Sequence, residues 1–295
     1  MLLIRLYFPF KYSHSFGLKF SLVSISMAIL ISILFSNSLK AQGNLLITPR
    51  RAVFEGSKRS LDINLANTGE DTATYAISII QIRMKDDGGF ETITEPDPGQ
   101  RFADSYIRFF PRSVTLGPNE AQVVKVQLTK TNELTPGEYR SHFYFRAIPK
   151  QKPLGEEEKV KDTTTISVTL TPIFGITIPV IIRVGESSAK VTLTDLSFQT
   201  VNDTIPKFSM TFNRSGNMSV YGDLAVDYIS LQGKITRVGI ANGVAVYTPN
   251  AKRQFQFNLN KVTGVDFKAG TLRVIYSAPS DAKPVRYAEA ELKLN

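Results

Sequence analysis

Short β-type segments separated by turn residues fill this chain from Leu45 onward, and they constrain its fold more than any other feature. Most segments alternate apolar and polar residues, and clusters of Gly, Pro, Asn and Asp lie between them. Successive side chains of a strand point to opposite faces, so this alternation is typical of sheets with one buried face. No segment repeats its apolar residues with a helical period over a useful length. The sequence therefore predicts an all-β fold built of antiparallel sandwiches.

A polar hinge at residues 185–188, Gly-Glu-Ser-Ser, separates two groups of these segments. The first group has predicted strands at residues 53–54, 61–65, 74–82, 106–110, 121–128 and 140–147. The second has seven, at residues 191–198, 207–212, 222–231, 244–247, 254–259, 271–277 and 285–294. Seven strands in about 100 residues are typical of an immunoglobulin-like sandwich. We expect two such β-sandwich domains, residues 42–184 and 185–295, after an N-terminal signal peptide at residues 1–41.

The first 41 residues have the order of a secretory signal peptide. Arg5, Lys11 and Lys19 precede an apolar run at residues 20–35, and a short polar stretch leads to Ala41. The alternative is a membrane anchor, but this run of 16 residues is shorter than the roughly 20 residues that a spanning helix needs. We expect cleavage after Ala41 and an exported mature protein.

The composition of the exported part argues against several classes of function. The chain has no cysteine, so it relies on packing rather than disulfides and offers no cysteine for lipid attachment. Removal of residues 1–41 leaves 31 basic and 26 acidic residues, a net charge of +5 that is spread along the chain. A nucleic-acid-binding surface is therefore not expected, and solvated sheet faces account for the charge.

Residues suited to catalysis or metal binding are scarce. Of the two histidines, His14 lies in the signal segment and His142 lies in a predicted strand, where we expect a structural role. The acidic runs at residues 86–87 and 156–158 lie in glycine-rich or charged loops, and neither has the spacing of a calcium loop. We expect a protein that is not an enzyme, without a cofactor, a metal or a small-molecule substrate.

Residues 163–184, TTTISVTLTPIFGITIPVIIRV, form a long β-type run whose first half alternates. Ile166, Val168 and Leu170 share one face of this strand. A charged segment at residues 150–161 precedes it, and we expect that segment to be a mobile loop. The pattern favours a strand that lends its apolar side chains to a partner, and the alternative is an ordinary edge strand packed on its own sandwich.

The second half of this run, residues 173–184, is almost continuously apolar. Such a run is consistent with a strand that is buried on both faces. We expect it to be held in its own domain as it approaches the hinge, with Pro172 and Gly175 marking the change between the two halves.

Several short motifs, most of them in the first domain, occur together in one protein family. They are residues 50–67 (RRAVFEGSKRSLDINLAN), residues 111–116 (PRSVTL) with Pro118, residues 139–145 (YRSHFYF), and in the second domain residues 212–217 (FNRSGN) and 219–223 (SVYGD). In these motifs the chain resembles the periplasmic pilus chaperones of the PapD type. The resemblance covers most of residues 45–184 and rests chiefly on that part.

The resemblance implies two immunoglobulin-like sandwiches in a boomerang arrangement and a periplasmic chaperone. Such a chaperone donates a strand to a pilin-like or other exported β-rich subunit and delivers it to an outer-membrane usher, and it can form self-capping dimers. In the family two basic residues grip the subunit's C-terminal carboxylate. Arg51 matches the first, whereas Gly175 or Phe174 stands where the family has a lysine. Arg50 and Arg183 are candidates to replace that lysine.

Two hypotheses from different classes follow. The first is a chaperone for fibre subunits, and the second is a structural or adhesive envelope protein with tandem immunoglobulin-like domains. Under the second hypothesis, Arg51 is a solvated arginine at a strand end and residues 166–170 are an ordinary edge strand. An enzyme on a β-sandwich is disfavoured because the residues for catalysis are lacking.

Overall fold

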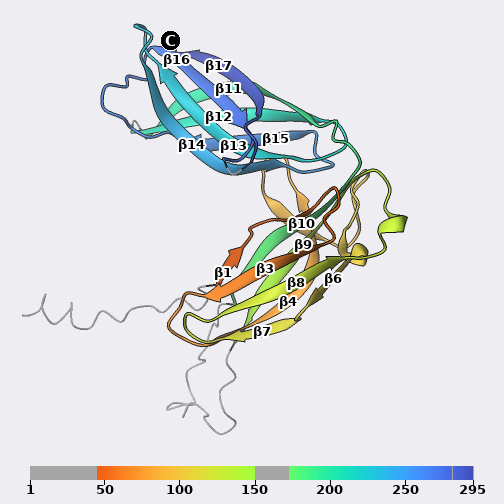
Figure 1. Ribbon diagram of the computed structural model, residues 1–295. Helices are drawn as coiled ribbons and strands as arrows, with labels where there is room; N and C mark the ends of the chain where they lie inside the picture. Colours follow the sequence, from red (N-terminus) through yellow and green to blue (C-terminus); the bar gives the residue numbers. More distant parts are fainter. Residues whose placement is uncertain (1–44, 150–172, 203, 281, 295) are drawn as a thin grey trace, which may run out of the picture. The chain divides into compact units, whose positions relative to one another are not determined.

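Two β-sandwiches make up the part of the chain that the structure describes, a computed structural model covering residues 45–149, 173–202, 204–280 and 282–294 (Figure 1). The predicted signal peptide, the predicted loop at residues 150–161 and the side chains of Ile166, Val168 and Leu170 lie outside the described residues. By its internal contacts the chain divides into Met1–Gln42 and Gly43–Asn295, so both sandwiches belong to one compact unit.

The first sandwich has ten described strands. They are β1 (Leu45–Thr48), β2 (Ala52–Phe54), β3 (Ser60–Asn67), β4 (Ala73–Met84), β5 (Phe90–Ile93), β6 (Ile107–Phe110), β7 (Ser113–Leu116), β8 (Ala121–Leu128), β9 (Gly137–Ile148) and β10 (Gly175–Val184). One sheet has the order β1-β3-β8-β6, and the other has the order β2-β10-β9-β4-β5, with β7 paired to β4. This arrangement corresponds to the two sheets of an immunoglobulin fold, with the first strand divided between them as β1 and β2.

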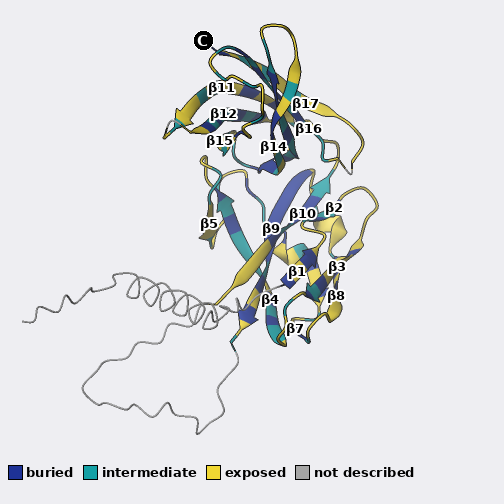
Figure 2. Ribbon diagram, turned by 90° about the vertical axis from the view of Figure 1, so that its left-hand side faces the viewer, coloured by how far each residue is buried: buried dark blue, intermediate teal, exposed yellow. Residues whose placement is uncertain are grey.

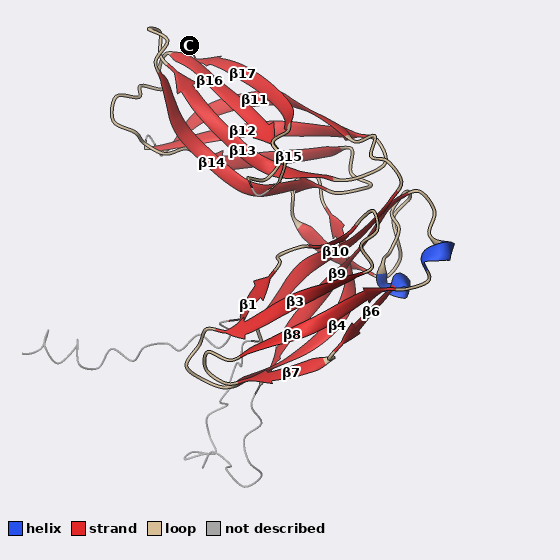
Figure 3. Ribbon diagram, viewed as in Figure 1, coloured by secondary structure: helices blue, strands red, loops and turns tan. Residues whose placement is uncertain are grey.

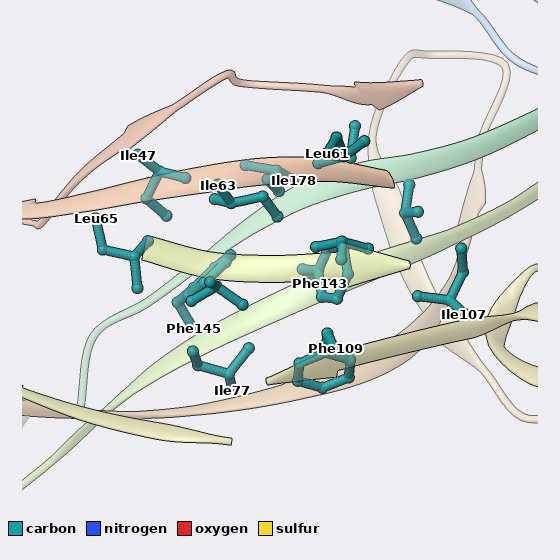
Figure 4. Close-up of a cluster of buried hydrophobic side chains, with 14 of the residues drawn as sticks. Ile47, Leu61, Ile63, Leu65, Ile77, Ile107, Phe109, Phe143, Phe145 and Ile178 are labelled. Atoms are coloured by element: carbon teal, nitrogen blue, oxygen red, sulfur yellow. The ribbon is translucent and has the colours of Figure 1, made fainter. Parts of the chain in front are cut away.

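The core of the first sandwich follows the alternation of its strands. Leu61, Ile63 and Leu65 on β3 are buried, whereas the polar residues between them are exposed. Figure 4 shows these side chains facing Phe143 and Phe145 of the opposite sheet. The two sheets thus bury one apolar face each, which is the physical basis of the sandwich.

The second sandwich has seven strands, as predicted. They are β11 (Lys190–Val201), β12 (Ile205–Ser215), β13 (Val220–Ile229), β14 (Ile235–Val246), β15 (Lys252–Asn258), β16 (Gly270–Ser277) and β17 (Arg286–Leu294). The orders are β11-β12-β15 in one sheet and β14-β13-β16-β17 in the other. A separate core fills this sandwich, in which the rings of Phe212 and Tyr276 meet edge to face at 5.1 Å between centroids.

The all-β prediction is confirmed, with differences at the ends of individual strands (Figure 3). The helical pieces among the described residues are two 3-10 turns, Asp104–Tyr106 and Thr131–Glu133. β14 begins nine residues before its predicted start at Val244, because Gly239 and Gly243 interrupt the apolar pattern without ending the strand. Within the described residues no helix has the length and apolarity needed to cross a membrane.

Candidate functional site

Among the described residues, one side of β10 is unpaired at its N-terminal end. β10 pairs with β9 over its whole length, but on its other side β2 pairs only with Val180–Ile182. The N–H of Ala147 on β9 donates to the carbonyl of Phe174 at 2.9 Å. Backbone N–H and C=O groups alternate in direction along a strand. Because the carbonyl of Phe174 points toward β9, the N–H and C=O groups of Gly175 and Thr177 point away from β9. Pro179 also faces that side and offers only its carbonyl, so among the described residues this stretch is a free edge.

Apolar side chains accompany this free edge. Ile173 is 50% exposed, Phe174 47% and Ile176 36%, whereas Ile178 is buried. The prediction that residues 173–184 are held in their own domain is confirmed for Gly175–Val184, which pair with β9, and the side chains of this run are exposed before Ile178. Neither β2 nor any other described strand covers their side of the sheet. An unpaired edge with exposed apolar side chains is a surface that favours addition of another strand.

Arg51 lies where the free edge ends. The parallel pairing of Ala52 with Val180 places Arg51 next to Pro179 in register, immediately before β2 begins. Arg51 lines a cleft of about 1260 Å3 whose walls come from both sandwiches and also include Arg50, Arg183, Lys190, Tyr221 and Arg286. Among the described residues of this lining Glu55 is the only acidic one, so their charge favours an anionic group.

The guanidinium of Arg51 offers two buried N–H groups without a partner. Its Nε and Nη2 atoms are buried and make no hydrogen bond, and its Cζ lies 3.7 Å from the ring centroid of Tyr221. Nε and Nη2 lie on one edge of the guanidinium plane, so their N–H groups form a fork that matches the two oxygens of a carboxylate. The same fork is occupied in Arg83, whose Nε and Nη2 donate to Asp97 at 2.6 and 2.5 Å.

The two candidates for a second basic anchor differ. Arg183 is engaged, because its Nε donates to Glu138 at 3.2 Å and its Nη2 to the carbonyl of Ser219 at 3.0 Å. Arg50 is exposed and pairs with no acidic group among the described residues. Arg183 is thus a structural residue in this molecule, and the open fork belongs to Arg51.

The absence of a lysine at position 175 has a steric explanation. A Cβ atom on Gly175 would lie 2.2 Å from Cε2 of Tyr144. The tyrosine ring on the neighbouring strand therefore fills the space that a longer side chain would need. Phe174, the other position considered for this lysine, is half exposed.

A buried carboxylate next to the cleft was not predicted from the sequence. The side chain of Glu138 on β9 has no exposed area, and it accepts hydrogen bonds from Arg183, from the N–H and Oγ of Ser219 and from Oγ of Thr248, at 2.6–3.2 Å. Four donors around one carboxylate satisfy the charge that burial would otherwise penalise. Because Ser219 and Thr248 belong to the second sandwich, Glu138 fixes that sandwich to β9.

Glu138, Arg140 and His142 share one face of β9, and all three are buried. Figure 2 shows the first part of β9 in dark blue. Arg140 donates to the carbonyls of Ile82 and Thr248, each at 3.2 Å. Residues of the second sandwich cover this face, which the alternation along one strand does not reveal.

His142 is a structural residue, as expected. Its ring meets Phe90 and Tyr247 edge to face, with centroids 6.2 and 6.4 Å apart. Burial, and secondarily the charge of Arg140, lower the pKa of His142 to about 3. The imidazole is therefore neutral at ordinary pH. No group of three or more His, Asp or Glu side chains that could hold a metal ion occurs in the described residues.

Comparisons with known proteins give structural similarities only. No family model matches the chain, and no curated protein has significant sequence similarity to it. Among solved structures, the YadV chaperone is 13% identical, with 85% of this chain and 100% of that chain covered and a TM-score of 0.40. The CsuC–CsuE chaperone–tip adhesion subunit complex of Acinetobacter baumannii is 11% identical, with 83% and 99% covered and a TM-score of 0.43. The Salmonella enterica SafA pilin in complex with the SafB chaperone is 12% identical, with 88% and 100% covered and a TM-score of 0.40.

Proposed function

We propose that this protein is a periplasmic chaperone that caps exported, pilin-like β-rich subunits by lending them a strand edge. The observation that carries the proposal is the free edge of β10, at whose end in register lies Arg51, with Nε and Nη2 that have no partner among the described residues. An edge and an anion-binding group at its end together form a site for the end of a polypeptide chain.

The register predicts the direction of the bound strand. β2 runs parallel to β10 and occupies the same side of it from Ala52 onward. A strand added opposite Gly175 and Thr177 and running in the same direction would reach Arg51 with its C-terminal end. An α-carboxylate there fits the guanidinium fork, whereas the antiparallel direction would bring an ammonium group to an arginine. The charge therefore selects a parallel strand with a free C-terminus.

The apolar residues supply the affinity. Ile166, Val168 and Leu170 belong to the expected donor strand, and Phe174 and Ile176 have the same parity in the sequence. Full burial of one such side chain contributes roughly 1.5–3 kcal/mol to the free energy of binding. Burial of several side chains therefore offsets part of the free-energy cost of ordering two chains. A subunit that lacks a strand would gain both an edge partner and apolar filling for its groove.

The remaining expectations belong to the same proposal. The domain division at residues 184 and 185, cleavage of residues 1–41, delivery of the subunit to an outer-membrane usher and formation of self-capping dimers follow from the resemblance in the first domain. None of them requires a cofactor or nucleotide, because binding energy from strand addition performs the function.

The test replaces the expected donor residues with charges. A double variant, V168D with L170D, is expected to remain folded by circular dichroism and to lose the small exported β-rich chains that the wild-type protein retains in a pull-down from periplasm. The matched control is S167D with T169D, which places the same charges on the opposite face and is expected to retain those chains. Equal retention by both double variants would refute strand donation by this segment and favour the structural or adhesive alternative.

A further inference from the structure

We propose that Tyr221 of the second sandwich is a positioning residue that holds the Arg51 fork in its carboxylate-binding orientation. The inference rests on the proposed function and deepens it, because it places part of the binding site on the second sandwich. The ring of Tyr221 would thus support the single arginine Arg51, in place of the lysine that forms the second half of the carboxylate anchor in the family that the chain resembles.

The guanidinium of Arg51 lies over the ring of Tyr221. The Cζ atom of Arg51 lies 3.7 Å from the centroid of the Tyr221 ring, close enough for stacking and for a cation–π interaction. Stacking on a ring restrains the plane of the guanidinium but uses none of its N–H groups. Nε and Nη2 of Arg51, which lie along one edge, are buried and have no partner among the described residues.

The ring of Tyr221 is itself held in place. Tyr221 pairs with Ala245 on β14, and it packs against the apolar cluster of Met84, Ile181, Ala245 and Tyr247. Gly243 leaves room for the ring, since a Cβ there would lie 3.0 Å from the tyrosine hydroxyl. Neighbours on several sides thus restrain the surface on which Arg51 rests.

The buried Glu138 fixes the strand that carries Tyr221. Glu138 accepts hydrogen bonds from both the N–H and the Oγ of Ser219, two residues before Tyr221 in the chain. Arg183 joins the same carboxylate and also binds the carbonyl of Ser219. Contacts that join β9 and β10 to the start of β13 therefore determine where the ring lies relative to Arg51.

An occupied fork in the same protein shows why a ring is needed here. Arg83 needs no such surface, because Asp97 binds its fork from within the first sandwich and restrains its guanidinium. Arg51 has no acidic partner among the described residues and would sample other rotamers without the ring. By restraining the side chain of Arg51 before a ligand binds, Tyr221 reduces the conformational entropy that the side chain loses when it binds a carboxylate.

The experiment follows the Nε–H resonance of Arg51 by NMR in the full mature chain, assigned by its loss in Arg51→Lys. The probe is N-acetyl-isoleucine, which carries a free carboxylate, and the matched negative probe is N-acetyl-isoleucinamide. In the wild-type protein the acid is expected to shift this resonance and the amide is not. In Tyr221→Leu, half of the maximal shift is expected at an acid concentration about tenfold higher than in the wild type. The reason is that loss of the cation–π contact weakens binding by about a factor of ten.

Two further variants separate positioning from general packing. Tyr221→Phe keeps the ring and is expected to restore wild-type binding of the acid. Phe255→Leu removes a ring from beneath a different arginine, Arg253, whose Cζ lies 5.4 Å from that ring centroid, and is expected to bind the acid as the wild type does. If Tyr221→Leu does not fold, Tyr221→Met replaces it, because methionine fills the space without a ring.

The outcomes are distinct. Equal acid concentrations for half the shift in wild type and in the folded Leu or Met variant would overturn the positioning role. No preference for acid over amide at wild-type Arg51 would overturn it together with the carboxylate fork. The proposed function fails separately, if wild-type protein retains no exported β-rich chains in the pull-down.

Discussion

Arg51 and Arg183 line the same cleft. Arg51 immediately precedes β2 and Arg183 belongs to β10, two strands that pair with each other, yet the surroundings of the two side chains differ. The Nε and Nη2 groups of Arg183 are occupied by Glu138 and Ser219. The corresponding groups of Arg51 are buried and have no partner among the described residues, and its guanidinium rests on Tyr221. One arginine thus completes an internal network, and the other lines the cleft with an unpaired fork.

This difference indicates how a structural charge can be told from a functional one. A buried charge with all its donors satisfied stabilises the arrangement around it, and it has no capacity left for a ligand. Buried donors without a partner cost free energy unless something outside the chain binds them. Substitutions at Glu138, Arg51, His142 and Arg50 test this distinction.

Removal of the carboxylate that engages Arg183 should have the largest effect. Glu138→Ala leaves the buried donors of Ser219, Thr248 and Arg183 without their acceptor, so we expect a loss of about 3–5 kcal/mol in the free energy of unfolding. Urea unfolding of wild type and variant measures this loss. Asp62→Ala, which removes an exposed partner of Lys125, serves as the control. A loss as small as that of the control would mean that the network around Arg183 is not structural.

Removal of the open fork should affect binding rather than stability. Arg51→Met is expected to weaken binding of a subunit identified in the pull-down by about 2 kcal/mol, roughly 30-fold, because a charge-assisted bidentate contact is lost. Its free energy of unfolding should change by less than about 1 kcal/mol, since only the contact with Tyr221 is removed. Calorimetric titration and urea unfolding measure the two quantities. A large stability loss with unchanged affinity would reverse the roles assigned to the two arginines.

The buried face of β9 should make stability depend on pH. The folded pKa of His142, about 3, lies below the unfolded value of about 6.5, so between these pH values only the unfolded chain binds the proton. Lowering the pH from 7.5 to 5.0 should therefore reduce the free energy of unfolding of the wild type by about 1–2 kcal/mol more than that of His142→Phe. Above pH 7 the free energies of unfolding of the two proteins should change with pH in the same way. Urea unfolding at both pH values is the measurement. An identical pH dependence in both proteins would show that the imidazole titrates freely.

The exposed neighbour of Arg51 should matter least. Arg50→Ser removes a solvated charge with no acidic partner among the described residues, so both the affinity for the subunit and the free energy of unfolding should change by less than about 0.5 kcal/mol. The same calorimetric and urea measurements apply. An affinity loss equal to that of Arg51→Met would assign the anchor to the pair of arginines instead of to one fork.

Much of the fold was predictable because strand alternation is a local property. Leu61, Ile63 and Leu65 alternate with polar residues, and they are buried as this pattern predicts. Arg51 was predictable as a candidate only through the motif around it. The short strands β1 and β5 were not predicted, because four residues at a sheet edge carry little alternation.

Other parts of the candidate site depend on neighbours that are distant in the sequence. The alternation of Glu138, Arg140 and His142 has the same appearance whether water or another sandwich covers them. Tyr221 lay in a recognised motif, but its role depends on a stacking contact with a residue 170 positions earlier. The reason that a glycine stands at position 175 is likewise visible only in the folded protein, where Tyr144 of the paired strand fills the space beside it.

The all-β class, the seven strands of the second sandwich and the apolar run that ends in β10 follow from local pattern, because periodicity and turn residues act over a few neighbouring positions. Three properties follow only from the folded arrangement of the described residues: which charges are buried, which guanidinium fork stays unpaired and where β10 has no neighbouring strand. Those properties arise from pairing and packing between segments far apart in the chain, where solvent exclusion and hydrogen-bond geometry, and not local pattern, determine the outcome.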